Sequence, residues 1–186
     1  MNPANFCETT GCERHVVLVT PDVHWNTGNI GRTCLGAGAS LHLIHPLGFS
    51  LDDKAVRRAG LDYWPKVKPR EWAAFSEFIQ GMGVEPEEVV LLTKSGAHHF
   101  WNMPSPRRLF LVFGSETRGL PDNILSAYPD RTYRIPITAD IRSLNLSTAA
   151  GIVLYESLRR HVTSAGSEPS ARKTAARGRS REKSPG

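Results

Sequence analysis

Three short segments of this 186-residue chain combine glycine with polar side chains of the kinds that bind ligands and align reacting groups. They span residues 26–32, 113–120 and 142–147. Each follows an apolar run that is typical of a buried strand. Binding sites in α/β proteins usually form where strands end, because backbone groups and helix N-termini are free there. We therefore predict that the three segments form one composite site.

The first segment places Arg32 about a turn and a half inside a predicted helix. Helical side chains tilt toward the N-terminus, so its guanidinium can reach back over residues 26–29. A cation there opposes the helix dipole, which a purely structural residue would avoid. Two simpler interpretations remain open. Arg32 can be a surface residue paired with a carboxylate, and Asn26 and Gly28 can be a helix cap and a turn.

The second segment begins with Gly114, which ends a strand that should be buried on both faces. A glycine at such a position permits close approach of a ligand or of another chain segment. Glu116 and Arg118 follow on a loop that Gly119 makes tight. This charged pair either belongs to the site or is simply solvated on the turn.

The third segment runs from an apolar strand end with Ile135 into Ser143, Leu144 and Asn145, just before a predicted helix. It offers free backbone groups together with the Ser143 hydroxyl and the Asn145 amide. Either Asn145 or Ser147 can cap the helix. Capping is compatible with a second role in binding.

Apolar runs and helical periodicity alternate along the chain. Strands are predicted at residues 16–20, 41–44, 89–92, 109–113 and 133–135. Helices are predicted at residues 26–38, 52–59, 72–79, 120–127 and 145–161. This alternation predicts an α/β protein with a mainly parallel sheet and helices on both faces. No Gly-x-Gly-x-x-Gly or Gly-Lys-Ser/Thr loop follows a strand, which disfavours a standard dinucleotide or nucleoside triphosphate site.

The composition, 40% hydrophobic and 22% charged, is typical of one globular domain. Three cysteines are too few for a disulfide framework, and Cys7 and Cys12 lack a second pair with zinc-type spacing. His98 and His99 are interpreted as a loop feature, so no metal is expected. The chain shows neither a membrane span of about 20 apolar residues nor a signal sequence, which favours the cytoplasm.

Positive charge is concentrated at the C-terminus. Residues 163–186 hold six Lys/Arg against two Glu, almost all of the net charge of +5. Few large apolar side chains occur there, which predicts a basic disordered tail. The tail either improves solubility or acts as an electrostatic arm toward nucleic acid. We therefore divide the chain into a flexible N-terminal extension (1–15), one folded domain (16–162) and this tail.

The three segments also carry a resemblance. The patterns Asn-x-Gly-x-x-x-Arg, Phe-Gly-x-Glu-x-x-Gly-Leu and Ile-Pro…Ser-x-Asn-Leu-Ser resemble the motifs of the SPOUT-class RNA ribose 2′-O-methyltransferases, in order and spacing, from about Val16 to Arg160. Further blocks at residues 46–49, 52–54 and 57–63 (Arg-Arg-Ala-Gly-Leu-Asp-Tyr) are similar to one subfamily. It is the tRNA (cytidine/uridine-34) 2′-O-methyltransferase subfamily, the TrmL type.

The resemblance implies a C-terminal deep trefoil knot that binds S-adenosylmethionine, and a homodimer in which two subunits complete the site. The residues it implies as cofactor contacts are Leu92, Gly114, Ile135, Ser143 and Leu144. It implies Arg32 as the catalytic residue. The positions implied to shape the site or hold RNA are Asn26, Glu116, Arg118 and Asn145.

The implied reaction is S-adenosylmethionine-dependent 2′-O-methylation of the wobble nucleotide of tRNA, without a metal. A ribose hydroxyl is a poor nucleophile, so Arg32 would orient it and stabilise the developing alkoxide. Whether Arg32 itself accepts the proton stays open, since a guanidinium remains protonated. The alternatives are another tRNA or rRNA ribose as target, or an RNA-binding protein without catalysis.

Two features depart from the family pattern. About 15 residues precede the first predicted strand, and His24-Trp25 stands where a Pro-rich approach to Asn26 is expected. Trp25 either stacks on a base or packs against the protein.

Overall fold

The computed structural model describes residues 11–51 and 63–165. The predicted helix at 52–59, most of the 57–63 block, most of the N-terminal extension and residues 166–186 of the predicted tail lie outside the described residues.

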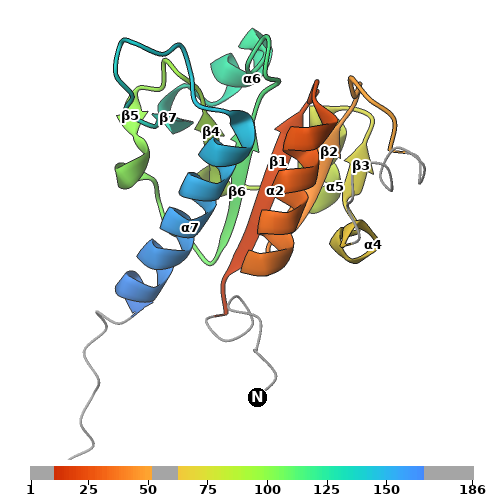
Figure 1. Cartoon of the computed structure of the whole chain (residues 1–186). Coiled ribbons are helices and arrows are strands. Elements are labelled where there is room, and N and C mark those ends of the chain that lie inside the picture. Colours follow the sequence, from red (N-terminus) through yellow and green to blue (C-terminus); the bar gives the residue numbers. More distant parts are fainter. Residues whose placement is uncertain (1–10, 52–62, 166–186) are drawn as a thin grey trace, which may run out of the picture.

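Seven strands form one sheet in the order β3-β2-β1-β6-β4-β7-β5 (Figure 1). They are β1 (Glu13–Val19), β2 (Ser40–Ile44), β3 (Arg70–Trp72), β4 (Val89–Leu92), β5 (His98–His99), β6 (Arg108–Phe113) and β7 (Thr132–Arg134). Every pair of neighbouring strands is parallel. All carboxyl ends therefore lie at one edge of the sheet, the edge at which the three polar segments begin.

Helices cover both faces of the sheet, as predicted (Figure 1). The α-helices are α2 (His24–Ala37), α4 (Trp64–Val67), α5 (Phe75–Met82), α6 (Asp122–Ala127) and α7 (Leu146–Ala165). The short 3₁₀ turns are η1 (Pro86–Glu88), η2 (Phe100–Asn102) and η3 (Pro129–Arg131). Helices α2 and α7 pack on one face, with α4 beside α2, whereas α5 and α6 pack on the other.

The two cores follow from the alternation of side chains along β1. Val16 and Leu18 point into the core shared with α2 and α7, and Val17 and Val19 into the core shared with α5. All four side chains are buried. A strand that is apolar on both faces needs a cover on both, which is why these residues occupy the middle of a two-sided sheet.

Strand β1 begins at Glu13, three residues before its predicted start. Arg14 is fully buried, and its guanidinium donates to the carbonyl oxygens of Pro106 (3.1 Å) and Arg107 (2.8 Å). The charged side chain of Arg14 interrupts the apolar pattern, so the start of the strand could not be recognised in the sequence. Hydrogen bonds from its guanidinium to carbonyl groups distant in the sequence offset part of the cost of burying it.

Trp72 ends strand β3, so the helix predicted at 72–79 is wrong in its first turn; α5 begins at Phe75. Trp72, Phe75 and Ile79 nevertheless pack against the same core, which explains their helix-like spacing. The predicted loop at His98 and His99 is likewise wrong, because both residues form the edge strand β5. Neither strand has an apolar run long enough to be visible in the sequence.

A chain of hydrogen bonds joins the side chains of β1, β2 and β3. The indole of Trp72 donates to Nδ1 of His42 (3.1 Å), and Nε2 of His42 lies 3.0 Å from Nδ1 of His15. Because Nδ1 of His42 accepts, its proton sits on Nε2 and is donated to His15. Both rings are therefore neutral in the folded protein.

We expect these histidines to make the protein sensitive to acid. Burial lowers the pKa of His15 to about 4, aided by the positive charge of Arg108, and lowers the pKa of His42 to about 3, aided by His15. The unfolded chain then binds more protons than the folded one below pH 6.5, so stability falls as the pH falls. Between pH 7 and pH 5 the free energy of unfolding should drop by about 2 kcal/mol for each histidine taken singly.

Denaturant unfolding at several pH values measures this drop. The variant His15→Phe keeps the stacking on Phe110, whose ring centroid lies 4.5 Å away, and removes one titrating group. It should show a shallower pH dependence than the parent protein. Equal pH dependence of the two proteins would contradict the assignment.

Within the described part of the chain, no helix is both long and apolar enough to cross a membrane. The trefoil knot that the resemblance implies stays a prediction.

Candidate active site at the carboxyl ends of the strands

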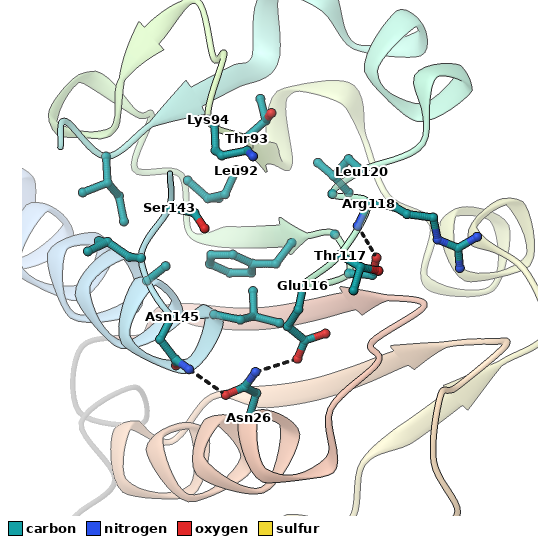
Figure 2. Close-up of a pocket in the computed structure, with 18 of the residues that line it drawn as sticks. Asn26, Leu92, Thr93, Lys94, Glu116, Thr117, Arg118, Leu120, Ser143 and Asn145 are labelled. Carbon is teal, nitrogen blue, oxygen red and sulfur yellow. Dashed lines mark hydrogen bonds between the residues drawn. The ribbon is translucent and has the colours of Figure 1, made fainter. Parts of the chain in front are cut away.

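A cavity of about 520 Å³ lies at the carboxyl ends of β4, β6 and β7 (Figure 2). Its volume is typical of small-molecule sites. All three predicted segments contribute to its wall. The predicted site residues that line it are Asn26, Leu92, Gly114, Glu116, Arg118, Ile135, Ser143, Leu144 and Asn145. The three predicted segments therefore meet at one cavity, as expected.

Hydrogen bonds tie the three segments together. Nδ2 of Asn145 donates to Oδ1 of Asn26 (3.0 Å), and Nδ2 of Asn26 donates to Oε1 of Glu116 (2.7 Å). Figure 2 shows this chain along the lower wall of the cavity. Asn26 is only 8% exposed, and its amide is hydrogen-bonded through both its oxygen and its nitrogen. The row uses both ends of each amide, which fixes how the segments face one another.

Asn145 also caps helix α7. Its Oδ1 accepts from the backbone N–H of Ser147 (2.9 Å) and from the Ser147 hydroxyl (2.7 Å). Asn145 thus caps the helix and lines the cavity at the same time. The cap fixes the amide that reaches Asn26, because both bonds come from one rigid side-chain group.

Two further hydrogen bonds, both involving Asp22, hold the loop that carries Glu116. The backbone N–H of Asp22 donates to Oε2 of Glu116 (2.8 Å), and the Thr117 hydroxyl donates to Oδ2 of Asp22 (2.5 Å). The Thr117 bond is the main reason that the pKa of Asp22 lies below its usual range. Sequence reasoning missed Asp22 and Thr117. Asp22 lies three residues after the end of β1, so the strand-end rule would have pointed to it.

Position 114 must be a glycine because residues 119 and 120 of the same loop pack directly against it. A Cβ on Gly114 would lie 2.0 Å from the carbonyl carbon of Gly119 and 2.2 Å from the nitrogen of Leu120. The turn closes through paired backbone bonds between Ser115 and Gly119 (3.2 and 2.9 Å). Of the two roles considered for Gly114, close approach of another chain segment is the one seen.

Arg118 and Arg32 both lie away from the inner wall. Arg118 lines the rim, is exposed, and directs its guanidinium outward (Figure 2). Arg32 is exposed on α2 and is absent from the cavity lining. Its guanidinium carbon lies 5.2 Å from the ring centroid of Tyr63. Among the described residues, the ion pairs involve other side chains.

Tyr63 fixes the position of Arg32 from a separate segment. Its hydroxyl donates to the carbonyl oxygen of Gly28 (3.1 Å), one turn before Arg32 on α2. The ring face then attracts the guanidinium through a cation–π interaction. A single side chain therefore anchors to the helix and orients the cation on it.

The sequence of this chain matches a known protein family. The family described as SpoU rRNA Methylase matches residues 13–155, which include all three site segments. The chain belongs to the SpoU methylase family. A Listeria innocua relative is 47% identical over 149 residues, 78% of this chain and 86% of the relative.

Other members of the SpoU family carry more specific names. A Burkholderia cenocepacia relative, 42% identical over 146 residues (78% of this chain, 94% of the relative), is named tRNA (cytidine(34)-2′-O)-methyltransferase. A structure described as giving insights into the 2-OH methylation of C/U34 on tRNA has a TM-score of 0.73 and 36% identity, covering 83% of this chain and 99% of that one. An AdoMet-bound rRNA methyltransferase from Sinorhizobium meliloti has a TM-score of 0.69 and 27% identity, covering 80% and 56%.

This SpoU-family cavity includes residues that sequence reasoning did not name. Thr93 and Lys94 follow β4 directly, and Tyr133 belongs to β7. Thr93 and Lys94 lie at the top of the cavity in Figure 2. The strand-end rule applied to β4 would have found both. No group of three metal-ligating side chains occurs in the described ranges 11–51 and 63–165.

We expect Asn26→Ala to loosen the site. The change leaves Glu116 and Asn145 without their shared partner, and loss of a buried hydrogen-bond partner costs about 1–3 kcal/mol. Asn29→Ala is the matched control, because Asn29 is exposed on the same helix and the change in helix propensity cancels. Chemical unfolding should show the difference. Equal stability of the two variants would show that the amide row adds nothing.

Proposed function

We propose that this protein transfers a methyl group from S-adenosylmethionine to the ribose 2′-hydroxyl of the wobble nucleotide, cytidine or uridine 34, of tRNA. The observation that carries this proposal is the convergence of all three motif segments on one cavity, joined through Asn26. The names of the 42% identical relative and of the 36% identical structure support the same reaction. A tRNA substrate also agrees with the cytoplasmic location expected from the sequence.

The cavity lining fits S-adenosylmethionine. Apolar side chains, among them Leu92, Ile135 and Leu144, suit an adenine ring, while strand-end backbone and the Ser143 hydroxyl suit its polar groups. We assign these residues and Gly114 to holding the cofactor. When bound, the cofactor supplies a sulfonium methyl group, which is the electrophile of the reaction.

The chain's own contribution to the reaction is alignment and charge. Arg32 presents five N–H donors and no acceptor, so it can hold the ribose hydroxyl oxygen and stabilise negative charge that develops on it. The ring of Tyr63 keeps this guanidinium in place. Asn26, Glu116 and Asn145 keep the wall of the site rigid, because each amide or carboxylate in the row is already satisfied. Arg118 at the rim is placed to meet RNA phosphate.

We also propose that the active form is a homodimer. In a single chain Arg32 does not line the cavity, so the site lacks its catalytic residue. Exposed apolar side chains on the same pair of helices support a second copy as the missing wall: Leu35 on α2, and Ile152 and Tyr155 on α7. Light scattering on the purified protein should give twice the chain mass. A monomer at assay concentration would contradict the shared site.

Methyl transfer from a labelled donor to bulk tRNA tests the reaction itself. Label should appear on the ribose of nucleotide 34. Label on another ribose would favour methylation elsewhere in tRNA or in rRNA, the activity of the 27% identical structure. Donor binding without transfer to any RNA would leave a binding protein. Calorimetric titration with the donor separates that outcome from a failure to bind it.

A further inference from the structure

Trp25 lies in the first turn of α2 with most of its side chain in solvent. It is 56% exposed at the start of α2, between Val23 and Asn26, which both line the cavity. A ring exposed to this extent leaves apolar area that a ligand can cover, and covering it gains hydrophobic free energy. Trp25 is therefore only partly packed in the single chain.

The ring of Trp25 is supported from behind. Its centroid lies 4.2 Å from that of His24, and His24 lies 6.3 Å from Phe49. The loop that carries Phe49 is held in place, since the N–H of Gly48 donates to the carbonyl oxygen of Pro21 (2.9 Å). A Cβ on Gly48 would lie 2.8 Å from Asp22, so the two loops pack without space between them. Trp25 is the outer ring of a supported aromatic row.

Trp25 shares a helix face with Arg32. Residues 25, 29 and 32 are spaced by four and three positions and are all exposed, which puts them on one side of α2. Seven residues of helix span about 10 Å. Stacked nucleotides repeat about every 3.4 Å along a strand. A ribose at Arg32 therefore brings bases within a few nucleotides of it to Trp25.

We propose that Trp25 stacks on an unpaired nucleobase of the RNA, within a few nucleotides of the methylated ribose. The proposal rests on the proposed function and names how that site holds its substrate. Single-stranded loops are bound by stacking bases on aromatic side chains, which tolerates different bases. His24 and Trp25 would thus replace a turn-forming segment with a binding platform.

The position of Trp25 favours RNA over a second copy of the chain. The other exposed apolar residues of α2 and α7 are Leu35 near the C-terminal end of α2, and Ile152 and Tyr155 in the middle part of α7. Leu35 is ten residues beyond Trp25, about 15 Å along the helix. Trp25 instead lies on the face of α2 that carries Arg32, beside which the reacting ribose is proposed to lie.

Full-length variants and an anticodon stem–loop RNA test the proposal. Trp25→Ala should weaken binding of this RNA about tenfold and raise its KM similarly, with kcat at saturating RNA and affinity for S-adenosylmethionine unchanged. Trp25→Tyr should bind nearly as well as the parent protein, because it keeps an aromatic face. Trp101→Ala is the matched control, since Trp101 is 54% exposed and lies in η2 rather than on α2, and it should bind normally.

Stem–loops with a single abasic nucleotide locate the contact. One abasic position in the loop should weaken binding to the parent protein and leave binding to Trp25→Ala unaffected. Equal sensitivity of both proteins at every position would overturn the proposal, as would normal RNA binding by Trp25→Ala or its dissociation into monomers. If the parent protein does not methylate nucleotide 34 but an abasic nucleotide still weakens its RNA binding, the proposed reaction alone would be refuted.

Discussion

Replacing Arg32 with alanine should lower the rate of methyl transfer about 10²–10³-fold or more, while S-adenosylmethionine still binds. Arg32 is the one cation of the first motif, and Tyr63 holds its guanidinium by a ring contact at 5.2 Å. It lies outside the cavity lining, so its removal leaves the cofactor contacts in place. The loss should therefore appear in kcat rather than in cofactor affinity. Single-turnover methylation and calorimetric binding of the donor measure the two effects separately.

Two further variants sharpen the Arg32 result. Arg32→Lys keeps the charge and loses the planar fork, so it should recover only part of the rate. Arg107→Ala is a matched control, because Arg107 is highly exposed and precedes β6 at the opposite end of the sheet. It should react at the parent rate. Loss of donor binding by Arg32→Ala, or a rate near that of the parent, would refute the assigned role.

Replacing Gly114 with alanine should destabilise the protein by about 3 kcal/mol or more and abolish binding of S-adenosylmethionine. The added methyl group would lie 2.0 Å from backbone carbon of Gly119, which cannot rotate away as a side chain could. The turn between Ser115 and Gly119 must then open. The same turn carries Glu116, so the row through Asn26 is disturbed as well. Thermal unfolding and donor titration measure both effects.

Gly36→Ala is the control for this substitution. Gly36 is exposed within α2, and a Cβ there meets only the Tyr155 hydroxyl at 4.0 Å. Alanine in a helix is favoured over glycine by about 0.5–1 kcal/mol, so this variant should be as stable as the parent or more so. If Gly114→Ala unfolds at the same temperature as Gly36→Ala, the loop does not pack as described.

Much of the site could be predicted from the sequence because its segments obey local rules. Gly114, Asn26 and Asn145 each stand where a strand ends or a helix begins, and such positions are readable from apolar runs and turn residues. The apolar runs of β1, β4 and β6 revealed the sheet for the same reason. The short strands β3 and β5 stayed hidden because their few residues, among them Trp72 and His98, form no periodic pattern.

The sequence by itself determined the longer elements and the three polar segments, since both depend on neighbours along the chain. Only the tertiary structure decided which of these segments meet. Asn26 and Asn145 are 119 residues apart, and Asp22 and Thr117 are 95 apart. The buried row of Trp72, His42 and His15 likewise depends on the order β3-β2-β1. Such pairs are set by strand order and register, which arise from burial of both sheet faces at once and leave no local mark.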